Sequence, residues 1–350
     1  MNRAKQTGAE AQHAMAPRSA LFRWPGRNDW RQLFPALQGQ RELSLCDVST
    51  ASRPVDHTLI FGSAMAEEVL GALRHTRDCL ILANEADRDQ CKALEGIHGL
   101  LYSDNPRYQY AEILNRFCDI ASVRGALQWD GARGCSLAQN VVISPSAIVE
   151  PGVTIARDSF IGEGTYVMSG ARIGPRVRIG TKTVIRENAV IGGFGFGVAF
   201  TKDRPPLRIP HLGGVVIGND VEIGALSTVC SGTLDPTVIK DHVKIDDHVH
   251  IAHNCCLEEE IIATGCAEVS GSVKIGRRAW LGPNCSLIEK IEIGAGCTIG
   301  LGAVVLDSVP GGTTVMGNPA RTLQVLARER IKLWKLLGGE NPADRRGPGC

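Results

Sequence analysis

Aromatic residues and long apolar runs are both scarce in this 350-residue chain. Phe, Trp and Tyr make up 5% of it, and no apolar run reaches the length of a membrane span. The 38 basic residues are balanced by 37 acidic ones, which argues against a general nucleic-acid-binding surface. No two of the twelve cysteines form a C-x-x-C pair, so neither a zinc ribbon nor a disulfide framework is indicated. Because the polar N-terminus also lacks a signal-peptide core, we expect a cytoplasmic protein.

An aliphatic residue recurs at every sixth position through the second half of the chain. The ladder comprises Ile143, Val149, Ile155, Ile161, Val167, Ile173, Ile179, Ile185, Ile191, Ile217, Ile223, Val229, Ile239, Ile245, Ile251, Leu257, Ala263, Val269, Ile275, Leu281, Leu287, Ile293, Ile299 and Val305. Neither the period of an α-helix nor the alternation of a β-strand produces a spacing of six residues. Hexapeptide repeats indicate a parallel β-helix. Glycine often follows a ladder residue, as at Gly162 and Gly174, where we expect corners with unusual backbone angles.

The remaining patterns divide the chain into five segments. We predict a flexible tail (1–20), a small α/β domain that is either a structural cap or a substrate-recognition module (21–135), the β-helix (136–316), a terminating loop with a basic helix (317–340) and a second flexible tail (341–350). In the α/β domain, strands are expected at Leu59–Phe61 and Cys79–Leu82, and helices at Ala64–His75 and Pro106–Phe117. The basic helix is expected at Leu323–Leu337. It is either a solvated face or a surface for an acidic carrier protein or a polyphosphate.

Two interruptions break the ladder, and interruptions in a regular scaffold often carry function. The first, Gly192–Gly214, begins with a G-x-G string, but no helix pattern follows it, so a dinucleotide fingerprint is disfavoured. Since Phe194 and Phe196 are costly to leave in water, we expect this loop to fold over a neighbouring surface. The second interruption, Gly232–Val238, is interpreted as a shortened coil that resets the register before His253.

Four histidines crowd into one region, namely His242, His248, His250 and His253. If three hexads make one turn of a prism, His242 and His248 lie on different faces. The group then converges poorly, and no metal site is predicted.

His253 is the candidate for chemistry. It lies beside the register break, either as a stacked polar residue on the outer face or as a general base. Gly271 follows eighteen residues later, at the equivalent position one turn on. Since adjacent strands are about 4.8 Å apart, the Gly271 amide is expected close to the imidazole. A base beside an amide donor suits acyl transfer, with the amide stabilising the thioester oxyanion. For Cys255 and Cys256, simple packing is favoured over a covalent role.

Several motifs resemble the UDP-3-O-acylglucosamine N-acyltransferases of the lipid A pathway, within the hexapeptide acyltransferases. They are Ser103-Asp104-Asn105-Pro106-Arg107, Asn188-Ala189-Val190-Ile191-Gly192-Gly193-Phe194-Gly195-Phe196-Gly197, Arg208-Ile209-Pro210 and Ile251-Ala252-His253-Asn254. The resemblance spans roughly residues 35–310. It implies a left-handed β-helix, a homotrimer with active sites between subunits and an acyl-carrier-protein thioester as donor. By position, His253 matches the family's base and Gly271 its oxyanion glycine.

The chain departs from the family's pattern at three places. Cys230-Ser231-Gly232 replaces a usual Asp-Arg-Gly, Lys290 replaces a second active-site histidine, and Ile288 replaces an asparagine. The resemblance implies that the α/β domain (21–135) recognises the nucleotide sugar, and the segment Leu59–Met65 keeps one candidate ring, Phe61, for stacking on uridine. Gly317-Asn318-Pro319-Ala320-Arg321 resembles the ending of coenzyme-A-dependent sugar acetyltransferases.

We therefore predict an N-acyltransferase that moves an acyl group from an acyl-carrier-protein thioester to a UDP-linked amino sugar, with no bound cofactor. Its predicted substrate contacts are Phe61, Phe194, Phe196, His250, Asn254 and Lys290, and its predicted donor contacts are Arg321, Arg328 and Lys332. One alternative is an acetyl-CoA-dependent N-acetyltransferase acting on a nucleotide-linked deoxyamino sugar for surface polysaccharide. Another is an inactive binding or scaffold β-helix.

Overall fold

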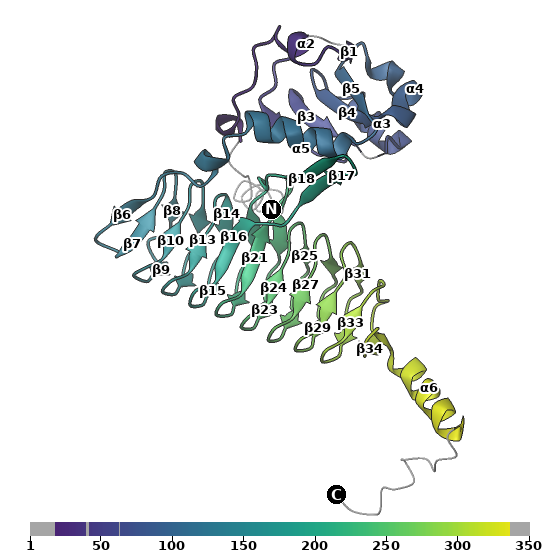
Figure 1. Cartoon of the computed structure of the whole chain (residues 1–350). Helices are drawn as coiled ribbons and strands as arrows, with labels where there is room; N and C mark the ends of the chain where they lie inside the picture. The colour runs from purple at the N-terminus through teal and green to yellow at the C-terminus, as the bar shows by residue number, and fades with distance from the viewer. Residues whose placement is uncertain (1–17, 40–41, 63, 337–350) are drawn as a thin grey trace, which may run out of the picture.

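The computed structural model describes residues 18–39, 42–62 and 64–336. Both predicted tails extend over residues outside this part of the chain. Figure 1 shows an N-terminal α/β domain above a three-sided β-helix, with one helix extending from the far end. In the described ranges, no helix combines the length and the apolar character needed to cross a membrane.

The α/β domain is built on a five-stranded sheet of order β1-β5-β4-β3-β2, parallel except at β1. Its strands are β1 (Gln38–Gly39), β2 (Asp47–Val48), β3 (Thr58–Phe61), β4 (Leu80–Asn84) and β5 (Gly99–Ser103). Its helices are α2 (Trp30–Leu33), α3 (Glu67–Leu73), α4 (Arg88–Cys91) and α5 (Pro106–Phe117), with 3₁₀ turns η1 (Ser19–Leu21), η2 (Glu85–Asp87), η3 (Lys92–Leu94) and η4 (Ile120–Val123).

Helix α5 has the predicted bounds, while α3 is shorter than predicted. Asn105 caps α5 by accepting a hydrogen bond from Tyr108 N at 3.0 Å, with Pro106 at the first helical position. At α3, Ala66 has an extended backbone and no capping side chain, so residues 64–66 lie outside the helix.

Each turn of the β-helix places one strand on each of three flat faces. The first face comprises β6 (Gln128–Asp130), β7 (Cys135–Leu137), β10 (Thr154–Ile155), β13 (Arg172–Ile173), β16 (Val190–Phe194), β21 (Thr228–Ser231), β24 (His250–Ile251), β27 (Glu268–Val269), β30 (Ser286–Leu287) and β33 (Val304–Val305). The second comprises β8 (Val142–Ile143), β11 (Phe160–Ile161), β14 (Val177–Ile179), β19 (Val215–Ile217), β22 (Thr237–Ile239), β25 (Cys256–Leu257), β28 (Lys274–Ile275) and β31 (Glu292–Ile293).

The third face contains the last two strands of the prism. It comprises β9 (Ile148–Val149), β12 (Tyr166–Val167), β15 (Val184–Ile185), β20 (Glu222–Ile223), β23 (Lys244–Ile245), β26 (Ile262–Ala263), β29 (Trp280–Leu281), β32 (Thr298–Ile299), β34 (Thr314–Met316) and β35 (Arg321–Thr322). The ladder residues form one continuous core inside the prism, with Ile143 and Val149 packed against its edge. Helix α6 (Leu323–Leu336) follows β35, and none of its residues is buried.

The glycines after the ladder residues correct one expectation. Neither Gly162 nor Gly174 is among the residues with positive φ. A Cβ on Gly162 would lie 2.3 Å from Gly180 O, and one on Gly174 would lie 2.2 Å from Gly192 O. These glycines are needed because neighbouring coils approach closely, not because a corner requires left-handed backbone.

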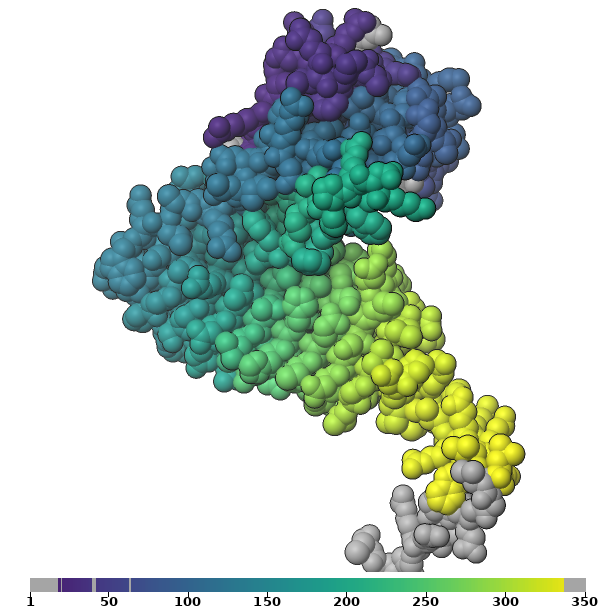
Figure 2. Space-filling view, viewed as in Figure 1, coloured from purple at the N-terminus to yellow at the C-terminus, as the bar shows by residue number. Residues whose placement is uncertain are grey.

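The first interruption forms a hairpin that lies against the α/β domain. Strands β17 (Val198–Thr201) and β18 (Arg204–Arg208) pair antiparallel. Asn105 Nδ2 donates to Phe200 O at 3.0 Å, and Tyr108 Oη donates to Pro205 O at 3.1 Å. Figure 2 shows this green-teal segment as the layer between the blue domain and the β-helix.

The predicted fold-over therefore occurs, but the reason given for it was wrong. Phe196 remains 79% exposed and Phe194 37% exposed in the chain. The contact is made instead by buried Ala199, Ile209 and Leu212, which join the core of the α/β domain.

The second interruption is a lengthened coil, which corrects the prediction of a shortened one. Strands on the first face are normally eighteen residues apart, as in the pairing of His250 with Glu268. Thr228, however, pairs with His250, twenty-two residues on. The four extra residues lie at the corner between β21 and β22, where they bring Thr233 and Asp235 beside His253.

Candidate functional site

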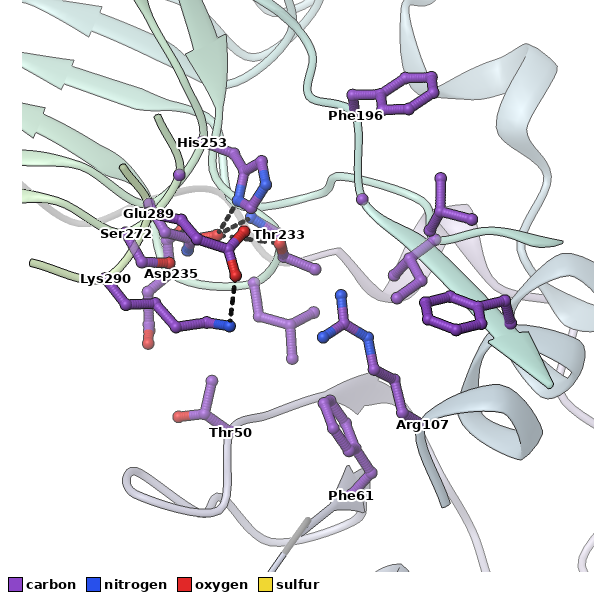
Figure 3. Close-up of a pocket in the computed structure, with 17 residues that line it drawn as sticks. Thr50, Phe61, Arg107, Phe196, Thr233, Asp235, His253, Ser272, Glu289 and Lys290 are labelled. Atoms are coloured by element: carbon purple, nitrogen blue, oxygen red, sulfur yellow. Dashed lines mark hydrogen bonds and ion pairs between the residues drawn. The ribbon is translucent and has the colours of Figure 1, made fainter. Parts of the chain in front are cut away.

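A cavity of about 580 Å³ lies between the α/β domain, the hairpin and one corner of the prism. The domain contributes Thr50, Phe61 and Arg107; the hairpin segment contributes Phe196, Gly197, Val198, Phe200 and Ile209; and the prism contributes Thr233, Leu234, Asp235, His253, Asn254, Gly271, Ser272, Glu289 and Lys290. Figure 3 shows Phe61 and Arg107 entering from the side opposite His253. Residues from three parts of the chain thus share one pocket.

His253 and Gly271 stack on successive coils, as their spacing predicted. Ser272 N donates to His253 O at 2.9 Å, which aligns the two corners. A Cβ on Gly271 would lie 2.8 Å from His253 Cε1 and 2.9 Å from Nε2. The imidazole therefore lies directly over the glycine, where any side chain would displace it.

Asn254 determines which ring nitrogen of His253 carries the proton and which is left as an acceptor. Its Oδ1 accepts hydrogen bonds from Thr233 N at 3.1 Å and from Thr233 Oγ1 at 2.9 Å, and its Nδ2 donates to Asp235 O at 3.2 Å. A backbone N–H can only donate, so this atom is the amide oxygen. His253 Nδ1, 3.0 Å from the same oxygen, must then carry the proton. In neutral His253, Nε2 is left with a lone pair, as a general base requires.

His211 is a residue of this site that the sequence reasoning missed. It is 1% exposed, and its ring centroid lies 4.9 Å from that of His253 in an edge-to-face arrangement. Nδ1 donates to Ile209 O at 2.9 Å, whereas Nε2 is buried without a partner among the described residues. Burial, with a smaller contribution from His253, lowers the pKa of His211 to about 4. His211 is therefore neutral at physiological pH. The only available signal was its position directly after Arg208-Ile209-Pro210.

The G-x-G string is explained by this imidazole. A Cβ on Gly195 would lie 2.8 Å from both His211 Nε2 and His253 Cβ, and one on Gly197 would lie 2.7 Å from His211 Cε1. The glycines allow the loop to cover both histidines. Next to them, the Arg208 guanidinium lies 4.5 Å from the centre of the Phe196 ring.

The predicted acceptor contacts are only partly brought together. Phe61, Phe196, Asn254 and Lys290 line the pocket, whereas Phe194 and His250 do not. His250 precedes an inward ladder residue, so its side chain lies on the flat outer face, where Nδ1 is 2.6 Å from Thr228 Oγ1. Arg107, Asp235 and Glu289 also line the pocket but were not among the predicted contacts, because their convergence depends on the arrangement of separate segments.

The predicted donor contacts lie elsewhere. Arg321 belongs to β35, and Arg328 and Lys332 belong to α6, beyond the end of the prism (Figure 1). None of the three lines the pocket.

The cysteines near the site have environments suited to packing. Burial raises the pKa of Cys255 to about 12, and its Sγ lies 3.2 Å from Ser270 O. Burial also raises the pKa of Cys230. Both therefore remain thiols at neutral pH, which makes them poor nucleophiles. The neighbouring Ser231 Oγ accepts a hydrogen bond from Gly214 N at 2.8 Å and so attaches the end of the first interruption to β21.

Within the described ranges, no group of three or more His, Cys, Asp and Glu side chains is arranged to hold a metal ion. His242 follows β22 and His248 follows β23, so the two occupy different corners of the prism.

Comparison with known proteins supports the repeat and the fold. Residues 158–193 and 272–307 match the bacterial transferase hexapeptide (six repeats) family. LpxA from Acinetobacter baumannii superposes with a TM-score of 0.50 at 24% identity, over 57% of this chain and 76% of that protein. Together they indicate that the parallel β-helix is left-handed, as predicted.

Two curated relatives confirm the predicted resemblance over part of the chain. The UDP-3-O-acylglucosamine N-acyltransferase of Caulobacter sp. (strain K31) is 39% identical over 155 residues, which are 44% of this chain and 45% of that protein. The protein of the same name from Coxiella burnetii (strain Dugway 5J108-111) is 36% identical over 156 residues, or 44% and 46% of the two chains. The matched part is thus less than half of each relative.

Proposed function

We propose that this chain is an N-acyltransferase that moves an acyl group from an acyl-carrier-protein thioester to the amine of a UDP-linked amino sugar, as in lipid A biosynthesis. The observation that carries the proposal is His253, whose Nδ1 is held by Asn254 and whose Nε2 lies against Gly271 in a pocket. The relatives named UDP-3-O-acylglucosamine N-acyltransferase support the choice of donor and acceptor classes.

The proposed reaction needs no nucleophile from the protein. The amine nitrogen of the acceptor attacks the thioester carbonyl carbon, and His253 Nε2 takes a proton from that amine. The carbon–sulfur bond then breaks, and His253 returns the proton to the departing thiolate. No described residue accepts a hydrogen bond from the Gly271 amide, so that N–H is available to the oxyanion.

The α/β domain would hold the nucleotide. Phe61 offers a ring face, and the Arg107 guanidinium, which forms no hydrogen bond or ion pair with a described residue, suits a diphosphate. We place the reaction in the cytoplasm and in a homotrimer. Arg321, Arg328 and Lys332 remain candidates for the acidic carrier, since α6 combines basic side chains with exposed Leu333 and Leu336.

The test is transfer by the purified full chain to a UDP-linked glucosamine derivative, with acyl-carrier-protein thioester and acetyl-CoA as competing donors. We expect transfer from the carrier protein and at least a hundredfold loss in kcat for His253→Ala, with the oligomer retained. Transfer from acetyl-CoA alone would establish the acetyltransferase alternative. Binding of the nucleotide sugar without turnover from either thioester would indicate a scaffold, and undiminished turnover by His253→Ala would refute the assigned base.

A further inference from the structure

Glu289 presents a carboxylate to the pocket one coil beyond Gly271. Leu287 pairs with Val269 on the first face, and Val269 pairs with Ile251. Glu289, Gly271 and His253 each follow one of these residues by two positions and therefore occupy the same corner. Figure 3 shows the Glu289 carboxylate between His253 and the end of Lys290.

The carboxylate is ionised and faces the Lys290 ammonium and the Arg107 guanidinium. Lys290 Nζ lies 2.8 Å from Glu289 Oε1. The Lys290 hydrogen bond is the largest cause that holds the pKa of Glu289 below its ordinary value, with smaller contributions from Arg107 and His253. Arg107 and His253 are therefore both within electrostatic range of this carboxylate.

The ion pair with Lys290 is easily exchanged. The Lys290 side chain is 68% exposed and that of Glu289 is 61% exposed. A pair in this environment contributes little net free energy, because water screens the attraction and both side chains lose conformational entropy. Another ammonium group can therefore take the place of Lys290 Nζ at small cost.

An amine acceptor supplies such a group. Near neutral pH an alkyl amine is largely protonated, whereas a hydroxyl at the same position is neutral. A carboxylate beside the base forms an ion pair with the ammonium, whereas a hydroxyl can only donate a hydrogen bond to it without a positive charge. The position of Glu289 thus offers discrimination between two acceptors of nearly the same shape.

We infer that Glu289 holds the ammonium group of the acceptor beside His253 and selects amine over hydroxyl acceptors. Lys290 competes with the acceptor for the ion pair with this carboxylate. The inference rests on the proposed function and assigns the amine-binding contact within it. Glu289 makes no covalent bond, and the first ammonium proton leaves to solvent at this exposed corner before the attack.

The test compares two ligands that differ at one position, UDP-glucosamine and UDP-glucose, by titration calorimetry with the full chain. We expect the wild-type protein to bind the amine about two- to fivefold more tightly, as befits an exposed ion pair, and Glu289→Gln to lose this preference without losing UDP-glucose affinity. The preference should fade above the pKa of the amine. Lys290→Met should increase affinity for the amine, because it removes the competing ammonium.

Glu292→Gln is the matched control. Glu292 forms the same kind of exposed pair, with Lys274 Nζ 2.8 Å from Oε1, but it does not line the pocket. This control should retain the preference. A preference that survives Glu289→Gln, or an equal loss of affinity for both ligands, would overturn the inference.

The transfer assay separates this inference from the function beneath it. If the wild-type protein transfers acyl groups to the amine and Glu289→Gln transfers them equally well, the role of Glu289 is refuted while the proposed function stands. If the wild-type protein neither binds nor acylates the amino sugar, both are refuted.

Discussion

Gly271→Ala places a single methyl group under the proposed base. Its Cβ would lie 2.8 Å from His253 Cε1, 2.9 Å from Nε2 and 3.4 Å from Nδ1. Carbon atoms in contact are normally at least about 3.5 Å apart, so the imidazole must move by roughly 0.7 Å. That movement strains the 3.0 Å hydrogen bond from Nδ1 to Asn254.

A displacement of about 1 Å in a reacting group costs about a hundredfold in rate. We therefore expect kcat of Gly271→Ala to fall about thirty- to a hundredfold. The free energy of unfolding should change by less than about 1 kcal/mol, because Gly271 is only partly buried and is not among the residues with positive φ. Steady-state transfer kinetics and urea unfolding measure the two quantities.

Gly265→Ala is the matched control at another corner of the prism. Its Cβ would meet Asp246 Oδ2 at 3.4 Å, an ordinary contact, so activity should persist. If Gly271→Ala transfers acyl groups at the wild-type rate, the imidazole does not work from its position over Gly271, and the assignment of the base and its neighbouring amide is wrong.

Three further predictions concern the surroundings of the base. Asn254→Gly keeps a residue suited to the left-handed backbone there (φ 60°) and removes the anchor of His253, so kcat should fall about tenfold in steady-state kinetics; an unchanged kcat would refute the role of Asn254 in orienting the imidazole. Phe61→Leu should raise KM for a UDP-sugar about tenfold in steady-state kinetics through the loss of stacking, and an equal KM would remove Phe61 from the nucleotide site. The folded-state pKa of His211 is about 4, below an ordinary value near 6.5. Between about pH 4 and pH 6.5 the unfolded state therefore binds more protons than the folded state, so the free energy of unfolding falls on acidification. Urea unfolding should show a loss of about 2 kcal/mol between pH 7 and pH 5 from this residue. His211→Gln should lack that loss, and an acid dependence identical to wild type would contradict the assignment.

The closeness of His253 to Gly271 was predictable because a β-helix converts sequence distance into spatial distance. Eighteen residues make one turn, so two residues at that spacing stack at one strand separation. The same rule failed at the lengthened coil, because aliphatic spacing reveals that the register changes but not how the extra residues are accommodated. Asn254 became informative only when its hydrogen bonds to Thr233 identified the amide oxygen.

The other half of the pocket was not predictable in this way. Phe61 and Arg107 reach it because the hairpin Val198–Arg208 holds α5 through hydrogen bonds to Asn105 and Tyr108. These contacts join residues more than ninety positions apart, and no repeat relates them. His211 was missed for the same reason, since its burial depends on the loop that folds over it.

By itself, the sequence determined the β-helix, its inward ladder and the stacking of His253 on Gly271, because a repeat that buries the same positions of every hexad permits a single arrangement of successive coils. The tertiary structure alone decided which side chains face that histidine from the other walls. Glu289, Arg107, Phe61 and His211 converge through the docking of a separate domain and the closure of an insertion, and such long-range packing leaves no periodic trace in the chain.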